Sequence, residues 1–280
     1  IQKYVNDDNE FLTAWRKVLT KVPIDFVKYL AIATQTFHAK HQIHLKNSPI
    51  HVAASDGSVD IYKQMMIKLA DLNERDIFGN NHAITLGFAA ENGQIKIYKH
   101  IVWELGDKNP ARLDGVTPLM FAAENGHYEV CKFIIANVED KNPARPNGVT
   151  PLFMAAQDGY FEICKLIIDN VGDKNPAMHD GATPLFIAAQ NGYFEICKLI
   201  IDNVDDKNPA THDGVTPLYV AAEKGHYEIC KLVTDHVDDK NPARPNGVTP
   251  LFIAAQNGHY EICKLIITNV DDKNPARNDG

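Results

Sequence analysis

The chain has 280 residues, of which 45% are apolar, so it is long enough to bury a large hydrophobic core. Its formal net charge of -8 argues against a nucleic-acid partner, because affinity for nucleic acid comes mainly from Lys and Arg on phosphates. No apolar run approaches the roughly 20 residues that cross a bilayer, so we expect no membrane insertion in this segment. Residues 1–9 lack an initiator Met and the layout of a signal peptide, which indicates an internal or trimmed start.

The N-terminal part predicts two amphipathic helices, over residues 9–19 and 23–36. His38, His41 and His44 follow them at a spacing that could suggest a metal site. They fall where a helix should be ending, and no Cys or paired carboxylate lies nearby. We therefore predict no metal site here.

From residue 107 onward the sequence repeats itself every 33 residues. Asp-Lys-Asn-Pro-Ala recurs in six copies, the first at Asp107 and the last at Asp272. Gly-Val-Thr-Pro-Leu recurs in register from Gly115, with Ala182 in place of Val in one copy. A period of this length is typical of stacked supersecondary units, none of which can bury its apolar face alone.

The residues of one repeat predict a pair of helices and an extended hairpin. Thr117 suits the N-cap of a short helix and Pro118 its first position, while Gly126 can end it in the left-handed conformation. Residues 130–135 then provide the broad apolar face of a second helix. The dipeptide at 147–148, Asn-Gly, is a strong signal for a tight turn.

The segment 247–267 reads Gly-Val-Thr-Pro-Leu-Phe-Ile-Ala-Ala-Gln-Asn-Gly-His-Tyr-Glu-Ile-Cys-Lys-Leu-Ile-Ile and closely resembles the ankyrin repeat pattern, as do its four preceding neighbours. Residues 48–57 and 82–105 resemble it more weakly and are separated by a three-residue insertion near 75–79. The resemblance implies an all-α ankyrin-repeat solenoid of stacked helix-turn-helix units with β-hairpin-like loops. The array would cover residues 44–280 in about seven repeats followed by the start of another, with 1–43 as a degenerate helical repeat or cap.

The chain departs from the family pattern at three recurrent positions. The family's Asp three residues before the turn Gly is replaced by Arg112, Arg145, Met178, Thr211 and Arg244. The family's His after Thr-Pro-Leu is retained at His51, but aromatic residues or Met replace it in later repeats, where we expect aromatic packing instead of the family's His–Thr hydrogen bond. The family's Gly after the second helix is Val, and the residue before this Val is usually Asn, as at Asn137. We expect this Asn to cap the helix, since Asn tolerates the left-handed conformation.

The cysteines follow the same period as the repeat. Stacked helices lie about 8–10 Å apart, whereas a disulfide tolerates a Cα separation of only about 7 Å. We therefore predict five free, buried thiols that pack as small apolar residues in an intracellular, cytoplasmic protein. They are Cys131, Cys164, Cys197, Cys230 and Cys263.

In the ankyrin family, partners bind the concave side, along the hairpin tips and first helices. The tips vary while their framework barely changes, which suits recognition of a partner or, equally, neutral drift. The column of Val116, Val149, Ala182, Val215 and Val248 is interpreted as hairpin packing in preference to a partner footprint. Carried over repeat by repeat, the implied binding residues are Arg112, Leu113, Asp114, Glu124, Asn125, Arg145, Pro146, Asn147, Gln157, Asp158, Met178, His179, Asp180, Gln190, Asn191, Thr211, His212, Asp213, Glu223, Lys224, Arg244, Pro245, Asn246, Gln256 and Asn257.

No glycine-rich phosphate loop, catalytic triad or paired acid/base site is visible, so we predict no enzyme, no cofactor and no metal. The Asp-Asp-Lys runs, such as 205–207, are interpreted as solvated loop charges. The leading hypothesis is a monomeric scaffold or adaptor that binds another protein. The alternative is the regulatory or targeting arm of a larger protein, such as an ion channel, toxin or pathogen effector. Because the sequence stops in the opening of another hairpin, we expect further chain or a cap; a secreted effector and the cytosolic arm of a membrane protein stay open.

Overall fold

The computed structural model describes residues 81–270, together with positions 54, 57 and 59. The helices predicted at 9–19 and 23–36, the histidines at 38–44 and the insertion near 75–79 lie outside the described residues. The chain divides into two compact units, residues 1–139 and 140–280, and each is described by itself.

In the described part of the first unit, residues 81–139, two helix pairs stack in series. Helix α6 packs on α8, and α7 packs on α9. Tyr98 of α7 meets Phe133 of α9 edge-on, with ring centroids 6.1 Å apart, and its hydroxyl donates to the Lys108 carbonyl at 2.6 Å. The bounds of the helices are Asn81–Glu91 for α6, Ile95–Leu105 for α7, Pro118–Glu124 for α8 and Tyr128–Ile135 for α9.

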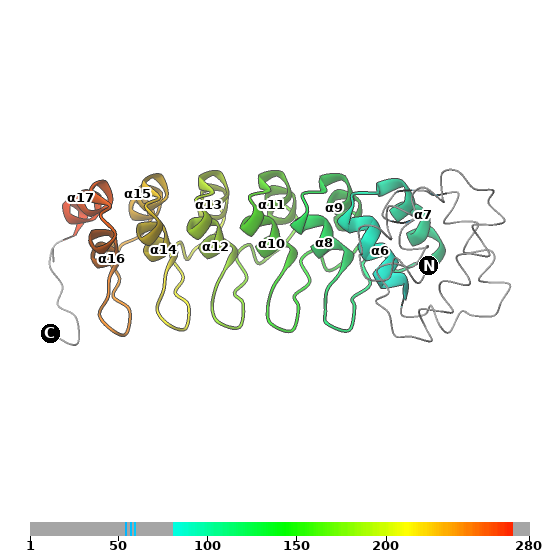
Figure 1. Cartoon of the computed structure of the whole chain (residues 1–280), viewed down its shortest axis with the longest axis horizontal. Helices are drawn as coiled ribbons and strands as arrows, with labels where there is room; N and C mark the ends of the chain where they lie inside the picture. Colours follow the sequence, from blue (N-terminus) through cyan, green and yellow to red (C-terminus); the bar gives the residue numbers. More distant parts are fainter. Residues whose placement is uncertain (1–53, 55–56, 58, 60–80, 271–280) are drawn as a thin grey trace, which may run out of the picture. The chain divides into compact units, whose positions relative to one another are not determined.

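Between residues 140 and 270 of the second unit four helix pairs stack in series, and the hairpin loops extend from the same side of the stack (Figure 1). The first helices α10, α12, α14 and α16 form one layer and the second helices α11, α13, α15 and α17 form the other. The helices are α10 (Pro151–Asp158), α11 (Phe161–Ile168), α12 (Pro184–Asn191), α13 (Phe194–Ile201), α14 (Pro217–Lys224), α15 (Tyr227–His236), α16 (Pro250–Gln256) and α17 (Tyr260–Asn269). Because the described residues form helices and no strands, the predicted all-α solenoid with hairpin-like loops is confirmed.

The first helix of each repeat is fixed by two caps, one local and one from the preceding loop. The Thr150 hydroxyl accepts a hydrogen bond from the Phe153 N–H at 3.2 Å, and Pro151 occupies the first turn, as the sequence predicts. The side-chain oxygen of Asn142 accepts from the Leu152 N–H at 2.9 Å. The same second cap recurs at Asn109, Asn175, Asn208 and Asn241.

In the run at 205–207 both Asp side chains are exposed, as interpreted, but Asp206 and Lys207 also form hydrogen bonds within the loop. Asp206 accepts a hydrogen bond from the Asn208 N–H at 3.0 Å, which orients the capping Asn. The Lys207 ammonium donates to the carbonyls of Ile201 and Val204 at 2.8 and 2.7 Å. The motif Asp-Lys-Asn thus joins the end of one repeat to the first helix of the next.

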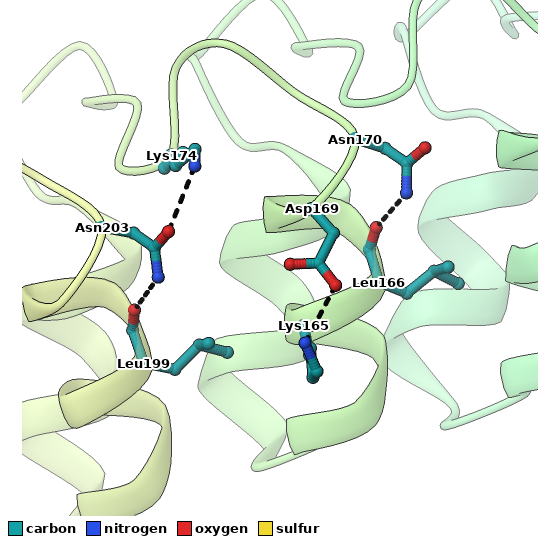
Figure 2. Close-up of polar contacts among 7 residues, drawn as sticks. All are labelled: Lys165, Leu166, Asp169, Asn170, Lys174, Leu199 and Asn203. Carbon is teal, nitrogen blue, oxygen red and sulfur yellow. Dashed lines mark hydrogen bonds and ion pairs between the residues drawn. The ribbon is translucent and has the colours of Figure 1, made fainter.

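The recurrent Asn lies two residues beyond the last residue of α11 and of α13, and its side-chain amide bonds back to the last turn of the helix. Asn170 and Asn203 donate to the carbonyls of Leu166 and Leu199 at 2.8 and 2.9 Å (Figure 2). Lys174 then donates to the Asn203 side-chain oxygen at 3.1 Å, which connects neighbouring repeats. These contacts satisfy carbonyl groups that a helix end otherwise leaves without a partner.

Neighbouring repeats also meet where each first helix ends. Gly192 has a φ of 83°, and a Cβ atom there would lie 2.7 Å from the His226 ring, so only glycine fits. The His226 ring in turn lies 3.1 Å from the Gln190 carbonyl, and His259 makes the same contact with Glu223. The turn glycine and the His of the next repeat are therefore parts of one interface.

The cysteines lie on the second helices, as predicted, and all five are free. Burial raises the pKa of the Cys164, Cys197 and Cys230 thiols to about 12. Cys263 is only half-buried, so the prediction of five buried thiols is wrong at this position. It lies on α17, the last helix of the described residues, whereas α11, α13 and α15 are each followed by another second helix.

Candidate partner-binding surface

Each hairpin is closed by a pair of backbone hydrogen bonds. In the hairpin around Asp180, the Met178 N–H donates to the Ala182 carbonyl at 2.8 Å, and the Gly181 N–H donates to Met178 at 2.9 Å. This turn presents His179 and Asp180 to solvent. The predicted hairpin-like loop therefore exposes two adjacent side chains at its tip.

Neighbouring tips are bonded directly to one another. The His179 N–H donates to the Asn147 carbonyl at 3.2 Å, and the His212 N–H donates to the Asp180 carbonyl at 2.9 Å. Gly181 has a φ of 88°, and a Cβ atom there would lie 2.8 Å from the Thr211 Cα atom. The glycine of one tip therefore permits the close approach of the next.

Pro245 breaks the row of backbone hydrogen bonds between neighbouring tips, and the side chain of Arg244 supplies a hydrogen bond in its place. Pro245 has no N–H to donate to the preceding tip. Instead the Arg244 Nε donates to the Asp213 carbonyl at 3.3 Å, and its guanidinium lies 5.2 Å from the centroid of the Tyr219 ring. Arg244 is therefore a link between repeats as well as a tip residue. The available sequence signal was that both tips with Pro have Arg just before it, at 145–146 and 244–245.

The structure places all the predicted partner-binding residues outside the core. Half-buried positions are Arg145, Met178, Gln190, Thr211, Glu223 and Arg244. Exposed positions in the first unit are Arg112, Leu113, Asp114, Glu124 and Asn125. Exposed positions in the second unit are Pro146, Asn147, Gln157, Asp158, His179, Asp180, Asn191, His212, Asp213, Lys224, Pro245, Asn246, Gln256 and Asn257.

Several of these side chains also hold the turn in which they lie. The side-chain oxygen of Asp180 accepts from the Ala182 N–H at 2.9 Å. In the tip around Asp213 the Thr211 hydroxyl takes over this role and accepts from the Val215 N–H at 3.1 Å. The turn-forming acceptor found at Asp180 recurs at Asp114, Asn147 and Asn246.

Two polar side chains at the ends of the first helices link neighbouring repeats. Asn191 donates from its side-chain amide to the Gln157 carbonyl at 2.8 Å, and Asn257 donates to the Glu223 carbonyl at 2.9 Å. These amides are exposed, but part of their hydrogen-bonding capacity is already used within the stack. A partner would therefore meet them as oriented groups.

The apolar column beside the tips belongs to the packing of the hairpins. Val116, Ala182 and Val248 are each 8% exposed, and Val149 and Val215 are half-buried. Little of the column is accessible, which supports the packing interpretation over a partner footprint.

The aromatic residues that replace the family's His are mostly packed as well. Phe153 and Tyr219 are buried, Phe186 is half-buried and Phe252 is 39% exposed. The Thr hydroxyl that the family's His would contact caps the helix start instead, as at Thr183. Aromatic packing at these positions is therefore as expected.

Residues 81–270 and the three isolated positions contain neither a cluster of metal ligands nor a membrane-spanning helix. No three His, Cys, Asp or Glu side chains of this part gather as metal ligands. None of the helices described has the length and apolar character needed to span a membrane.

A model of ankyrin repeats in three copies matches the chain at residues 86–178, 119–213 and 185–279. These overlapping matches cover 86–279, which is more than half of the chain. A comparison with curated proteins gave no match.

Proposed function

Because the chain belongs to the ankyrin repeat family, we propose that it is an interaction scaffold or adaptor that binds a protein partner along its hairpin tips and first helices. Ankyrin repeats are in general protein-interaction modules and not enzymes, and stacked repeats offer extended binding surfaces. The whole protein is accordingly proposed to act by binding and not by catalysis.

The observation that carries this proposal is the contrast between framework and tips in the second unit. Thr183 and Thr216 are identical and buried, and each caps a first helix. The exposed tip position next to this framework changes from Pro146 to His179 and back to Pro245 along the same unit. Sequence variation at exposed, backbone-bonded tips is the arrangement that a surface for reading a partner requires.

The proposal is tested by capturing the partner with the full chain as bait. We expect a triple variant, Arg145→Ala, His179→Ala and His212→Ala, to capture at most about one tenth as much partner as the wild-type chain. A few central residues contribute most of the binding free energy at other interfaces. Its control carries Lys198→Ala, Lys231→Ala and Glu228→Ala, three exposed positions on second helices with the same change in net charge. Equal retention by the two variants would contradict the proposed surface.

We also propose that the protein works in an intracellular, reducing compartment. Support comes from Cys131, Cys164, Cys197 and Cys230, which are free, buried and distributed one per repeat. Thiols persist in such compartments because glutathione and thioredoxin keep them reduced.

A further inference from the structure

Asparagine followed by glycine occurs in two structural settings within residues 140–270. Asn147 and Asn246 lie in hairpin tips, whereas Asn191 and Asn257 lie at the ends of first helices. All four Asn side chains are exposed, and in each place the N–H of the following Gly donates to a carbonyl. Exposure and the glycine bond therefore do not distinguish the two settings.

The hydrogen bonds of the Asn side chain do distinguish them. Asn191 donates from its side-chain nitrogen to the Gln157 carbonyl at 2.8 Å, so its amide nitrogen is held. Asn147 uses the other atom of its amide, since its oxygen accepts from the Val149 N–H at 3.2 Å. Its side-chain nitrogen has no partner among the described residues. The second Asn of each setting repeats the arrangement of the first.

This difference affects a reaction that an Asn-Gly pair can undergo by itself. The Gly nitrogen can attack the carbon of the Asn side-chain amide, and Gly obstructs the attack least because it has no side chain. The attacked carbonyl oxygen gains negative charge, which a positioned N–H donor stabilises. In the tip the Val149 N–H is such a donor, and the unbonded amide nitrogen is open to solvent as a leaving group. At the end of α12 the amide nitrogen is instead tied to a carbonyl.

We propose that Asn147 and Asn246 are sites of spontaneous deamidation, which converts a neutral tip into an acidic one. A bond forms between the Gly nitrogen and the Asn side-chain carbon, and the bond from that carbon to the amide nitrogen breaks. Ammonia leaves with the proton of the Gly nitrogen, and a cyclic imide remains. Water then opens the imide to Asp or to isoaspartate. The inference goes beyond the proposed function and does not depend on it, since it concerns the chemistry of the tips and not their binding.

The chain already contains the Asp form of this tip. Asp180 occupies the same place in a sister hairpin, where its side-chain oxygen accepts from the Ala182 N–H at 2.9 Å. Conversion of Asn147 to Asp should therefore keep the turn and add one negative charge. Isoaspartate, in contrast, lengthens the main chain of the tip by a carbon atom, so it should disturb the bond from the Arg145 N–H to the Val149 carbonyl.

The test follows each Asn by peptide mass spectrometry while the full chain is incubated at pH 8. We expect Asn147 and Asn246 to convert at least about fivefold faster than Asn191 and Asn257, because one retained hydrogen bond changes a population by about this factor. In urea the four rates should approach one another, since the fold no longer holds the side chains. Both Asp and isoaspartate should form, because the imide opens on either side.

Two matched substitutions place a new Asn-Gly pair in each setting. Asp180→Asn creates one in a tip, and Asp158→Asn creates one at the end of α10. The site made by Asp180→Asn should convert at about the rate of Asn147, and the site made by Asp158→Asn at about the rate of Asn191.

Four results would overturn the inference: equal rates at tips and helix ends in the folded chain, no conversion at 147 and 246, an Asp158→Asn site as fast as the Asp180→Asn site, or Asp as the sole product. The last result would mean direct hydrolysis by water without the cyclic imide. Capture of the partner is not used in this experiment, so its outcome leaves the proposed function untouched.

Discussion

Thr234 offers a direct measurement of how one position of the repeat controls the stability of the stack. It is 1% exposed on α15, where α11 and α13 place the fully buried Ile168 and Ile201. Its hydroxyl donates to the Lys231 carbonyl at 3.0 Å. Thr234→Ile would replace a buried hydroxyl with a methylene and add one methyl group.

The expected gain follows from the buried surface. Each buried methylene contributes about 0.8 kcal/mol, and the lost intrahelical hydrogen bond offsets part of this, so Thr234→Ile should stabilise by about 1 kcal/mol. The reciprocal change, Ile201→Thr, should destabilise by about 2 kcal/mol because the core around α13 cannot fully close on the smaller side chain.

Native-state hydrogen exchange measures both changes repeat by repeat, since it reports local opening as well as global unfolding. Thr234→Ile should slow exchange of the amides of α15 and its packed neighbours α13 and α17. Ile201→Thr should speed exchange in α13 and its neighbours α11 and α15. A destabilised Thr234→Ile variant would refute the reasoning, because it would mean that the site is already filled and that the repeats differ in their packed volume.

Three further predictions concern the caps, the tips and the thiols. Asn208→Ala should destabilise the chain by about 1–2 kcal/mol in urea unfolding, because the buried start of α14 loses an acceptor, while the exposed Asp205→Ala should be neutral within about 0.5 kcal/mol. Gly181→Ala should destabilise by at least about 1 kcal/mol because its φ is 88° and the next tip lies against it. Gly172→Ala is its control, since a Cβ atom there meets nothing within 4 Å. A thiol reagent at pH 8 should label Cys263 first and the four buried cysteines only on unfolding, and Cys263→Ser should remove the early reaction. Since the buried thiols keep their protons to about pH 12 when folded and lose them near 9 when unfolded, the urea midpoint should fall as the pH rises above 9.

The helices of the repeat could be predicted because their signals are local. Thr150 caps the start of α10 through a hydrogen bond with Phe153, three residues away, and Pro151 occupies the first turn. Gly159 ends the helix with a left-handed φ of 82°. The even spacing of the cysteines likewise indicated one buried thiol per second helix. Such features depend on neighbours in the chain, so a single repeat contains the information.

The contacts that join repeats could not be predicted in the same way. Asn142 caps a helix that starts ten residues later, and Lys174 reaches an Asn 29 residues away. The sequence marks Arg244 only as a variable tip residue, because its contact with the preceding repeat joins residues 31 positions apart. Cys263 is only half-buried because its repeat is the last one described, and the sequence of that repeat alone does not indicate its place in the array. The partner-binding assignment of the tips stays a prediction.

Several hydrogen bonds between repeats share a property that affects how such a chain can evolve. His226, Asn191 and Asn257 all reach main-chain carbonyls of the preceding repeat, and the tip at 212 bonds to the main chain at 180. A main-chain acceptor is present whatever residue occupies the position. These bonds therefore survive when one repeat is duplicated, deleted or exchanged, provided that its neighbour keeps glycine at the positions of Gly181 and Gly192. Recombination could lengthen or shuffle this array while its exposed side chains diverge independently.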